Sequence, residues 1–258
     1  MAETWDPSQY LKFAAPRLRP ALDLLARIDT EAPSAVYDLG CGTGMATRML
    51  AARWPEATVT GVDSSPEMLS TARREEGGMA IAWVESDVAG WAPSDGADVL
   101  FSNAALHWLE DHERLFPRLF GCLRRHGVLA VQMPRNHLAP SHVCMAEAAR
   151  AGPWRARLEA VLRPAPVAAP DAYYDILAPL ADAVDIWETE YTHVLDGENP
   201  VMEWTKSTAL RPLLAALDDG QRDGFLIEYA ARLAAAYPRR PDGTTIFPFR
   251  RLFIVARM

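Results

Sequence analysis

Residues 36–44 read Val-Tyr-Asp-Leu-Gly-Cys-Gly-Thr-Gly, a short apolar run that ends in three alternating glycines. We expect a β-strand followed by a tight loop, because glycine permits φ > 0 and lets a ligand approach the backbone closely. A helical pattern from Ala46 to Trp54 follows the loop and would bring free backbone N–H groups to it. This stretch therefore predicts a strand, a ligand-binding loop and a helix in succession.

The same alternation of strand-like runs and helical patterns continues as far as Pro134. It predicts an α/β fold, a parallel sheet with helices on both faces and right-handed crossovers. A period-two pattern at 185–194 and an apolar run at 252–256 would add an antiparallel hairpin, which makes a seven-stranded Rossmann-like sheet. Ligands of such sheets bind at the carboxyl ends of the strands. The further expected parallel strands lie at 58–63, 81–84, 98–101 and 128–131.

The organisation of the whole chain follows from these elements and from the prolines that interrupt the helical patterns after residue 134. We expect a single domain over residues 1–258, with an α-helical cap inserted on the substrate side of the sheet. The parts are a cofactor-binding core at 30–134, cap helices at 135–183 and 196–245, and closing strands at 184–195 and 249–258.

The spacing of the glycines and the acid that precedes them indicate the kind of ligand. A dinucleotide loop has the spacing G-x-G-x-x-G. If the pattern starts at Gly40, its third glycine would fall at residue 45, which is Met45. Asp38 would repel a pyrophosphate, whereas it suits a ligand that carries a positive charge. The ammonium or sulfonium side of S-adenosylmethionine is such a ligand, so we predict this cofactor rather than a dinucleotide.

Polar residues that follow the other strands would complete the pocket. Asp63 lies about 20 residues beyond the loop, where an acid accepts hydrogen bonds from ribose hydroxyls. Asp87 can accept a hydrogen bond from the exocyclic amino group of an adenine, with Val88 against the ring. Asn103 lies at the end of the fourth strand, again at the pocket. The predicted cofactor-binding residues are Asp38, Gly40, Gly42, Gly44, Asp63, Ser64, Met68, Asp87, Val88 and Asn103.

With these motifs the chain resembles the class I S-adenosylmethionine-dependent methyltransferases over residues 34–134. The resemblance implies that the loop from Asp38 to Gly44 is the family's signature loop. It also implies that Asp63 binds the ribose, that Asp87 binds the adenine, and that Asn103 lies near the methionine part of the cofactor.

A closer resemblance extends over nearly the whole chain, to methyltransferases that esterify a small tricarboxylic acid. It implies a small anionic substrate, which composition and spacing do not show. The segments that carry it are Trp5–Leu11, Val131–Pro134, Ala172–Leu177, Leu210–Pro212 and Arg251–Ala256.

Esterification places particular demands on the site. A carboxylate is already ionised at about pH 7, so its methylation needs no general base. The site needs cations that hold the other carboxylates, and arginine does this with two parallel hydrogen bonds. We favour Arg211 and Arg251, because both lie in family-like segments. The predicted substrate-binding residues are Tyr10, Trp108, Tyr173, Tyr174, Arg211 and Arg251.

Other interpretations remain open at this point. The aromatic residues in this set could be core residues, and the arginines could form surface ion pairs. A methyltransferase acting on an alcohol or an amine could use His107, just after the fourth strand, as its base. A non-catalytic module that kept the fold is disfavoured by the intact glycines and acids.

Composition limits the kinds of partner that we expect. The net charge of −8 and a pI near 5.3 disfavour nucleic acid, whose phosphates need a concentrated positive surface. The sequence contains no apolar run of about 18 residues, so no membrane span is expected. Three scattered cysteines and an acidic N-terminus without an apolar run predict a cytoplasmic protein with reduced thiols. The six histidines have no metal-binding spacing, so no metal is expected. The oligomeric state stays unknown.

Overall fold

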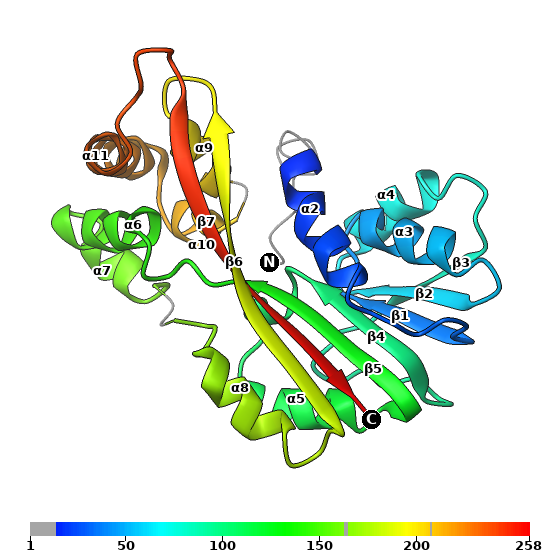
Figure 1. Ribbon diagram of the computed structural model, residues 1–258. Coiled ribbons are helices and arrows are strands. Elements are labelled where there is room, and N and C mark those ends of the chain that lie inside the picture. The colour runs from blue at the N-terminus through cyan, green and yellow to red at the C-terminus, as the bar shows by residue number, and fades with distance from the viewer. Residues whose placement is uncertain (1–13, 163–164, 207) are drawn as a thin grey trace. The chain divides into compact units, whose positions relative to one another are not determined.

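The computed structural model describes residues 14–162, 165–206 and 208–258. Its seven-stranded sheet has the order β3-β2-β1-β4-β5-β7-β6 (Figure 1). The strands are β1 (Ala35–Leu39), β2 (Thr58–Asp63), β3 (Ile81–Glu85), β4 (Ala97–Asn103), β5 (Leu123–Pro134), β6 (Ala183–Leu195) and β7 (Thr245–Arg257).

The topology confirms the predicted fold class. Strands β1 to β5 pair in parallel, and β7 is antiparallel to β5. In Figure 1 the arrows of β6 and β7 point in opposite directions, so the antiparallel pair that closes the sheet is present, although helices separate its two strands along the chain and it is not a hairpin. The sheet order changes direction between β1 and β4, and ligands of open α/β sheets bind at such a switch point, beyond the carboxyl ends of the strands.

The described residues form two compact units. The larger unit comprises residues 14–134, 166–189 and 251–258, and the smaller one 135–165 and 190–250. The smaller unit has its own core, which contains Trp204, Phe225, Tyr229 and Phe247. Its helices are α6 (Pro140–Ala151), α7 (Arg155–Glu159), α9 (Pro200–Lys206), α10 (Arg211–Ala215) and α11 (Asp219–Ala236).

Helices cover both faces of the sheet in the larger unit, as Figure 1 shows. One face carries α2 (Ala14–Leu25), α3 (Met45–Arg53) and α4 (Pro66–Arg74), and the other carries α5 (His112–Phe120) and α8 (Pro170–Leu177). A short 3₁₀ helix, η1 (Leu106–Trp108), follows β4.

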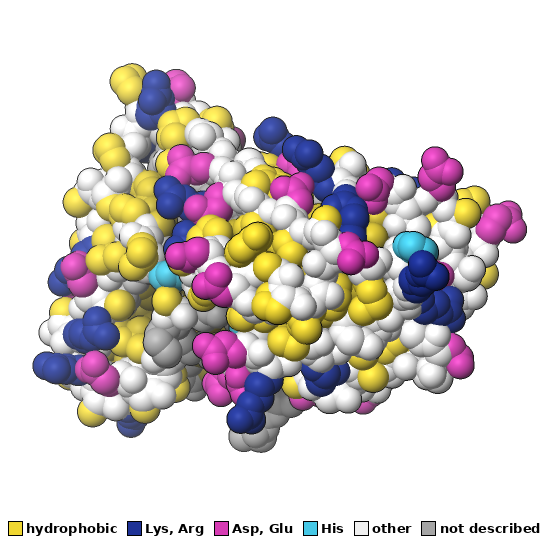
Figure 2. Space-filling model, turned by 60° about the horizontal axis from the view of Figure 1, so that its bottom comes forward, with side chains coloured by type: hydrophobic (Ala, Val, Ile, Leu, Met, Phe, Trp, Pro, Cys, Tyr) yellow, Lys and Arg dark blue, Asp and Glu magenta, His cyan; other side chains and the backbone are white. Residues whose placement is uncertain are grey.

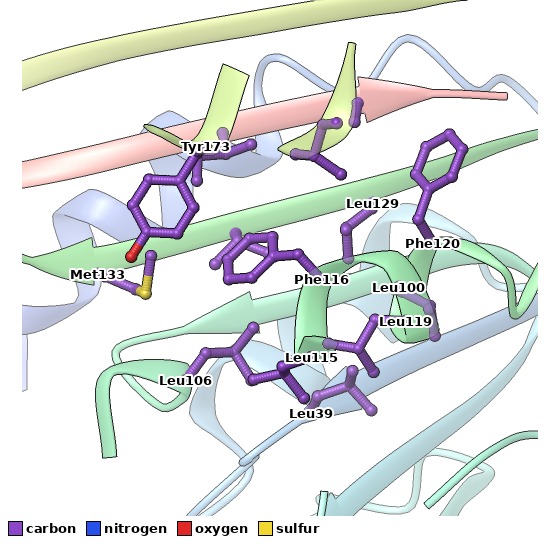
Figure 3. Close-up of a cluster of buried hydrophobic side chains, with 14 of the residues drawn as sticks. Leu39, Leu100, Leu106, Leu115, Phe116, Leu119, Phe120, Leu129, Met133 and Tyr173 are labelled. Atoms are coloured by element: carbon purple, nitrogen blue, oxygen red, sulfur yellow. The ribbon is translucent and has the colours of Figure 1, made fainter. Parts of the chain in front are cut away.

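The core between the sheet and α5 anchors the carboxyl ends of the strands (Figure 3). Leu39, Leu100 and Leu129 come from neighbouring strands and are fully buried, as are Phe116 and Leu119 of α5. Side chains alternate between the two faces of a strand, so packing of these leucines leaves the intervening residues for the opposite face. That opposite face carries the polar residues described below.

Some predicted boundaries are wrong. The strand expected at 128–131 begins already at Leu123, because Leu123 is buried and pairs with Ala97 of β4. Strand β7 begins at Thr245 rather than at residue 249. Thr245, Phe247 and Phe249 are buried, and this alternation continues the strand through Pro248.

Two features of the described residues bear on the kind of partner. None of the helices described has the length and apolarity needed to cross a membrane. On the face drawn in Figure 2, lysines and arginines are interspersed with aspartates and glutamates. The absence of a nucleic-acid partner stays a prediction from composition.

Candidate active site

The three glycines of the loop after β1 all have positive φ, +72° at Gly40, +53° at Gly42 and +75° at Gly44. A Cβ on Gly40 would lie 2.2 Å from the Cβ of Ala105, and one on Gly44 would lie 2.4 Å from Cη2 of Trp83. A Cβ on Gly42 would meet no described atom within 4 Å. The outer glycines therefore pack against the protein, and the middle one faces space that a ligand could enter.

Trp83 of β3 supports this loop, a role that was not predicted from the sequence. Its indole occupies the space above Gly44 and above Gly61, where a Cβ would lie 2.6 Å from the ring. Its Nε1 donates to Glu76 Oε2 at 3.0 Å, which fixes the ring. Gly61 within a strand was the available signal, because such glycines mark a close approach.

Asp63, at the end of β2, ties the loop to the start of α4. Its Oδ2 accepts from the Gly42 N–H at 2.8 Å, and its Oδ1 accepts from the Ser65 N–H at 2.9 Å. Each carboxylate oxygen can accept a further hydrogen bond, so two ribose hydroxyls fit this residue as well. Ser65 is the N-cap of α4, whereas the predicted contacts Ser64 and Met68 are exposed and buried respectively.

Asp38 is a buried carboxyl group directly before the glycines. It is 1% exposed, and its Oδ2 accepts from the Thr47 hydroxyl at 2.6 Å. Burial is the main cause that raises the pKa of Asp38; the Thr47 hydrogen bond lowers it and the nearby charge of Asp63 raises it, and together they give a pKa of about 7. A cation bound beside this carboxyl would favour its ionised form, which fits the sulfonium and ammonium groups of S-adenosylmethionine.

The pKa of Asp38 predicts a pH dependence of cofactor binding. As the pH falls below about 7 the carboxyl becomes protonated and neutral, so its attraction for a cation is lost. We expect the affinity for S-adenosylmethionine to fall by up to about tenfold per pH unit on the acid side, as for any binding that requires loss of one proton. Calorimetry at several pH values checks this. Asp38→Asn keeps an acceptor for Thr47 and should flatten the dependence; an equally steep dependence in that variant would contradict the assignment.

The loop after β3 holds the two residues predicted to meet an adenine. Val88 is buried, whereas Asp87 is exposed and accepts from the Ala89 N–H at 2.9 Å. Arg118 of α5, whose role was not predicted from the sequence, donates to the carbonyl oxygens of Val88 at 2.6 Å and Trp91 at 2.5 Å. This arginine therefore holds the loop to the helix beneath it.

The end of β4 offers a polar atom to a ligand. The buried Oδ1 of Asn103 has no hydrogen-bond partner within the described part of the chain. Ala104 follows it with φ +55° and donates its N–H to the carbonyl of Gln132 at 2.9 Å. A buried acceptor without a partner costs free energy, and a ligand's ammonium would satisfy it.

Strand register shows that several polar side chains share one face of the sheet. Asp38 is opposite Phe101, and Asn103 is opposite Gln132. Gln132 is in turn opposite Phe253, two residues from Arg251. Because directly opposite residues and every second residue along a strand point to the same side, Asp38, Asn103, Gln132 and Arg251 lie on one face.

Arg251 is 4% exposed, and its Nη1 donates to Gln132 Oε1 at 3.2 Å. Arg211, the other favoured arginine, is the first residue of α10 and belongs to the smaller unit. Tyr10 lies outside the described residues. The roles of all three toward a substrate stay predictions.

The two neighbouring tyrosines of α8 differ in their surroundings. Tyr173 is fully buried (Figure 3). Its hydroxyl contacts His112 Nδ1 at 2.7 Å and accepts from the Ala168 N–H at 3.2 Å. His112 Nε2 lies 3.0 Å from the carbonyl oxygen of Leu106 and donates to it, so these contacts support η1. Tyr174 is 54% exposed, so of the two it is the one with a ring open to solvent.

His107 and Trp108 lie on η1, directly after the end of β4. Their rings pack with centroids 4.9 Å apart, and the Nδ1 atom of His107 is buried. Nothing in the described residues gathers three or more histidine, cysteine or acidic side chains in a way that could hold a metal ion.

Comparison with known proteins adds to this geometry. A family model described as a methyltransferase domain matches residues 36–127. A trans-aconitate 2-methyltransferase of Azoarcus sp. (strain BH72) is 48% identical over 98% of both chains, and one of Rhodopseudomonas palustris (strain BisB18) is 47% identical over the same shares.

Solved structures agree on the fold. The YcgJ protein of Bacillus subtilis matches with a TM-score of 0.59 at 14% identity, over 93% of this chain and 98% of its own. Phosphoethanolamine N-methyltransferase 2 of Haemonchus contortus, solved with S-adenosyl-L-methionine, matches with a TM-score of 0.55 at 18% identity, over 92% of this chain and 52% of its own.

Proposed function

The chain belongs to the trans-aconitate 2-methyltransferase family, and from this premise we propose that it transfers the methyl group of S-adenosylmethionine to one carboxylate of trans-aconitate. The observation that carries the proposal is 48% identity over 98% of the chain to a relative of that name. It agrees with the substrate class that the sequence resemblance implies. The product is a monomethyl ester.

The cofactor is S-adenosylmethionine, as the glycine loop predicted. When bound, it supplies a methyl group made electrophilic by a sulfonium. Asp63 would hold the ribose, Val88 and Asp87 the adenine, and Asp38 and Asn103 the cationic end. The open space at Gly42 and the orphaned Asn103 Oδ1 support this assignment.

The remaining task of the chain is to hold and align an anion. The attacking carboxylate is already ionised, so the chain need not remove a proton from it. Correct placement of the two reactants can itself supply much of the rate enhancement. Arg251, a nearly buried guanidinium on the polar face of the sheet, is the residue that we favour to hold a second carboxylate of the acid. Further contacts are predicted from Tyr10, Trp108, Tyr173, Tyr174 and Arg211.

A turnover assay with trans-aconitate, cis-aconitate, isocitrate and citrate tests the proposal. We expect trans-aconitate to give the highest kcat/KM and a product that mild alkali cleaves, because it is an ester. An alkali-stable product would indicate a methyl ether or methylamine and would favour His107 as a base. Cofactor binding with no turnover of any acid would indicate a non-catalytic module. A cytoplasmic location stays a prediction.

Removal of Arg251 should weaken binding of the acid but not binding of the cofactor. A charge-assisted hydrogen bond is worth about 1.5–3 kcal/mol, so we expect Arg251→Ala to raise KM for trans-aconitate by roughly 10- to 100-fold. KM for S-adenosylmethionine should change by less than about threefold, since no cofactor contact is removed. Arg211→Ala and Arg250→Ala, an exposed neighbour on the same strand, provide comparisons. Unchanged kinetics in both Arg251→Ala and Arg211→Ala would place the anion site elsewhere.

A further inference from the structure

We propose that Gln132 is a positioning residue for Arg251, one that orients the guanidinium without neutralising it. The inference rests on the proposed function, because it assigns the charge of Arg251 to a carboxylate of the substrate. The amide oxygen of Gln132 accepts a hydrogen bond from Arg251, so we assign its effect to the arginine and not to a contact with the acid.

The geometry of the contact is that of a diagonal pair on one face of the sheet. Gln132 of β5 is opposite Phe253, and Arg251 lies two residues away on β7, on the same face. The amide oxygen accepts from Nη1 at 3.2 Å, with both side chains buried. A guanidinium has five donors in a fixed plane, so one hydrogen bond to a rigid partner restricts the direction of the others.

The identity of residue 132 matters for charge. A carboxylate at this position would accept the same hydrogen bond but would also pair its negative charge with the guanidinium. An amide makes the contact and adds no charge. The arginine therefore keeps its net attraction for an anion, as far as this contact is concerned.

A second observation indicates that packing alone does not explain an amide at this position. The buried Nε2 of Gln132 has no hydrogen-bond partner in the described ranges. A buried donor without a partner destabilises the fold, and an apolar residue of similar size would remove that cost. The hydrogen bond that its oxygen accepts from the arginine therefore explains a glutamine here better than packing does.

Two substitutions separate the charge effect from a structural one. Gln132→Glu keeps the shape and the acceptor but adds a negative charge, and Gln132→Leu removes the acceptor but adds no charge. We expect KM for trans-aconitate to rise about 30-fold or more in the Glu variant and less, about three- to tenfold, in the Leu variant. The affinity for S-adenosylmethionine should change less than about twofold in both.

A purely structural role predicts the reverse order, because glutamate preserves the hydrogen bond that leucine removes. The experiment measures kcat and KM for each substrate, the calorimetric affinity for S-adenosylmethionine, and the Tm of each variant. A Leu variant more impaired than the Glu variant, or an unchanged KM in the Glu variant, would overturn the inference. If the Glu variant does not fold, a raised KM with normal cofactor affinity in the Leu variant supports the inference, and an unchanged KM overturns it.

The wild-type protein distinguishes this failure from failure of the proposed function. If the wild type methylates trans-aconitate and the Glu variant does so with the same KM, the function stands and the role of Gln132 falls. If the wild type does not methylate trans-aconitate, the proposed function fails, and the role of Gln132 fails with it.

Discussion

Asp63→Ala is expected to weaken S-adenosylmethionine binding by at least about 100-fold. The carboxylate accepts the N–H groups of Gly42 and Ser65, and it is also the predicted acceptor for the ribose hydroxyls. Hydrogen bonds to a charged group contribute about 1.5–3 kcal/mol each, so loss of two of them accounts for a change of this size. Isothermal titration calorimetry with the cofactor measures the effect.

Two control variants sharpen the test of Asp63. Asp63→Asn keeps an acceptor oxygen and should bind the cofactor with intermediate affinity. Asp242→Ala removes an exposed acid of the smaller unit and should leave the affinity unchanged. Wild-type affinity in Asp63→Ala would show that the acid at the end of β2 does not hold the ribose.

Gly40→Ala is expected to lower the free energy of unfolding by about 2–6 kcal/mol. Two costs add at this position, the strain of a side chain at φ +72° and a Cβ only 2.2 Å from the Cβ of Ala105. Left-handed strain and overpacking each cost about 1–3 kcal/mol. Urea denaturation with an unchanged m-value would show a change in native-state stability.

Gly42→Ala is the matched control, since it shares the positive φ but meets no described atom within 4 Å. We expect a loss of only about 1–2 kcal/mol in stability, together with a cofactor affinity reduced about tenfold or more, because the added methyl group would fill the space left for the ligand. Equal destabilisation by the two alanines would mean that contact with Ala105 contributes nothing. Normal cofactor affinity in Gly42→Ala would exclude the cofactor from that space.

The sequence predicted those features that local spacing controls. The glycines from 40 to 44 and the acids at 38, 63 and 87 follow strands whose pattern is plain, and parallel strands bring their carboxyl ends to one edge. The parallel sheet with helices on both of its faces followed from the rules for α/β proteins. The fold and the cofactor could therefore be predicted from the sequence.

The residues that support the site could not be predicted in this way, because their roles depend on neighbours that are distant in the sequence. Trp83 supports the loop only because β3 lies beside β2, and Arg118 reaches from α5 to a loop 27 residues earlier. The contact between Gln132 and Arg251 joins residues 119 positions apart. Tyr173 carries the same sequence signal as Tyr174, yet packing against His112 and Phe116 buries only the first.

The place of β7 has a consequence for how a newly made chain acquires its activities. This strand comes after β6 along the chain but lies between β5 and β6 in the sheet. A ribosome delivers the chain from the N-terminus, so the five parallel strands can pair while β6 still lacks its neighbour. The nascent protein thus gains its glycine loop early and Arg251 only with β7. Until then the edge of β5 that β7 covers exposes unpaired backbone groups, which are a site for chaperone capture or aggregation.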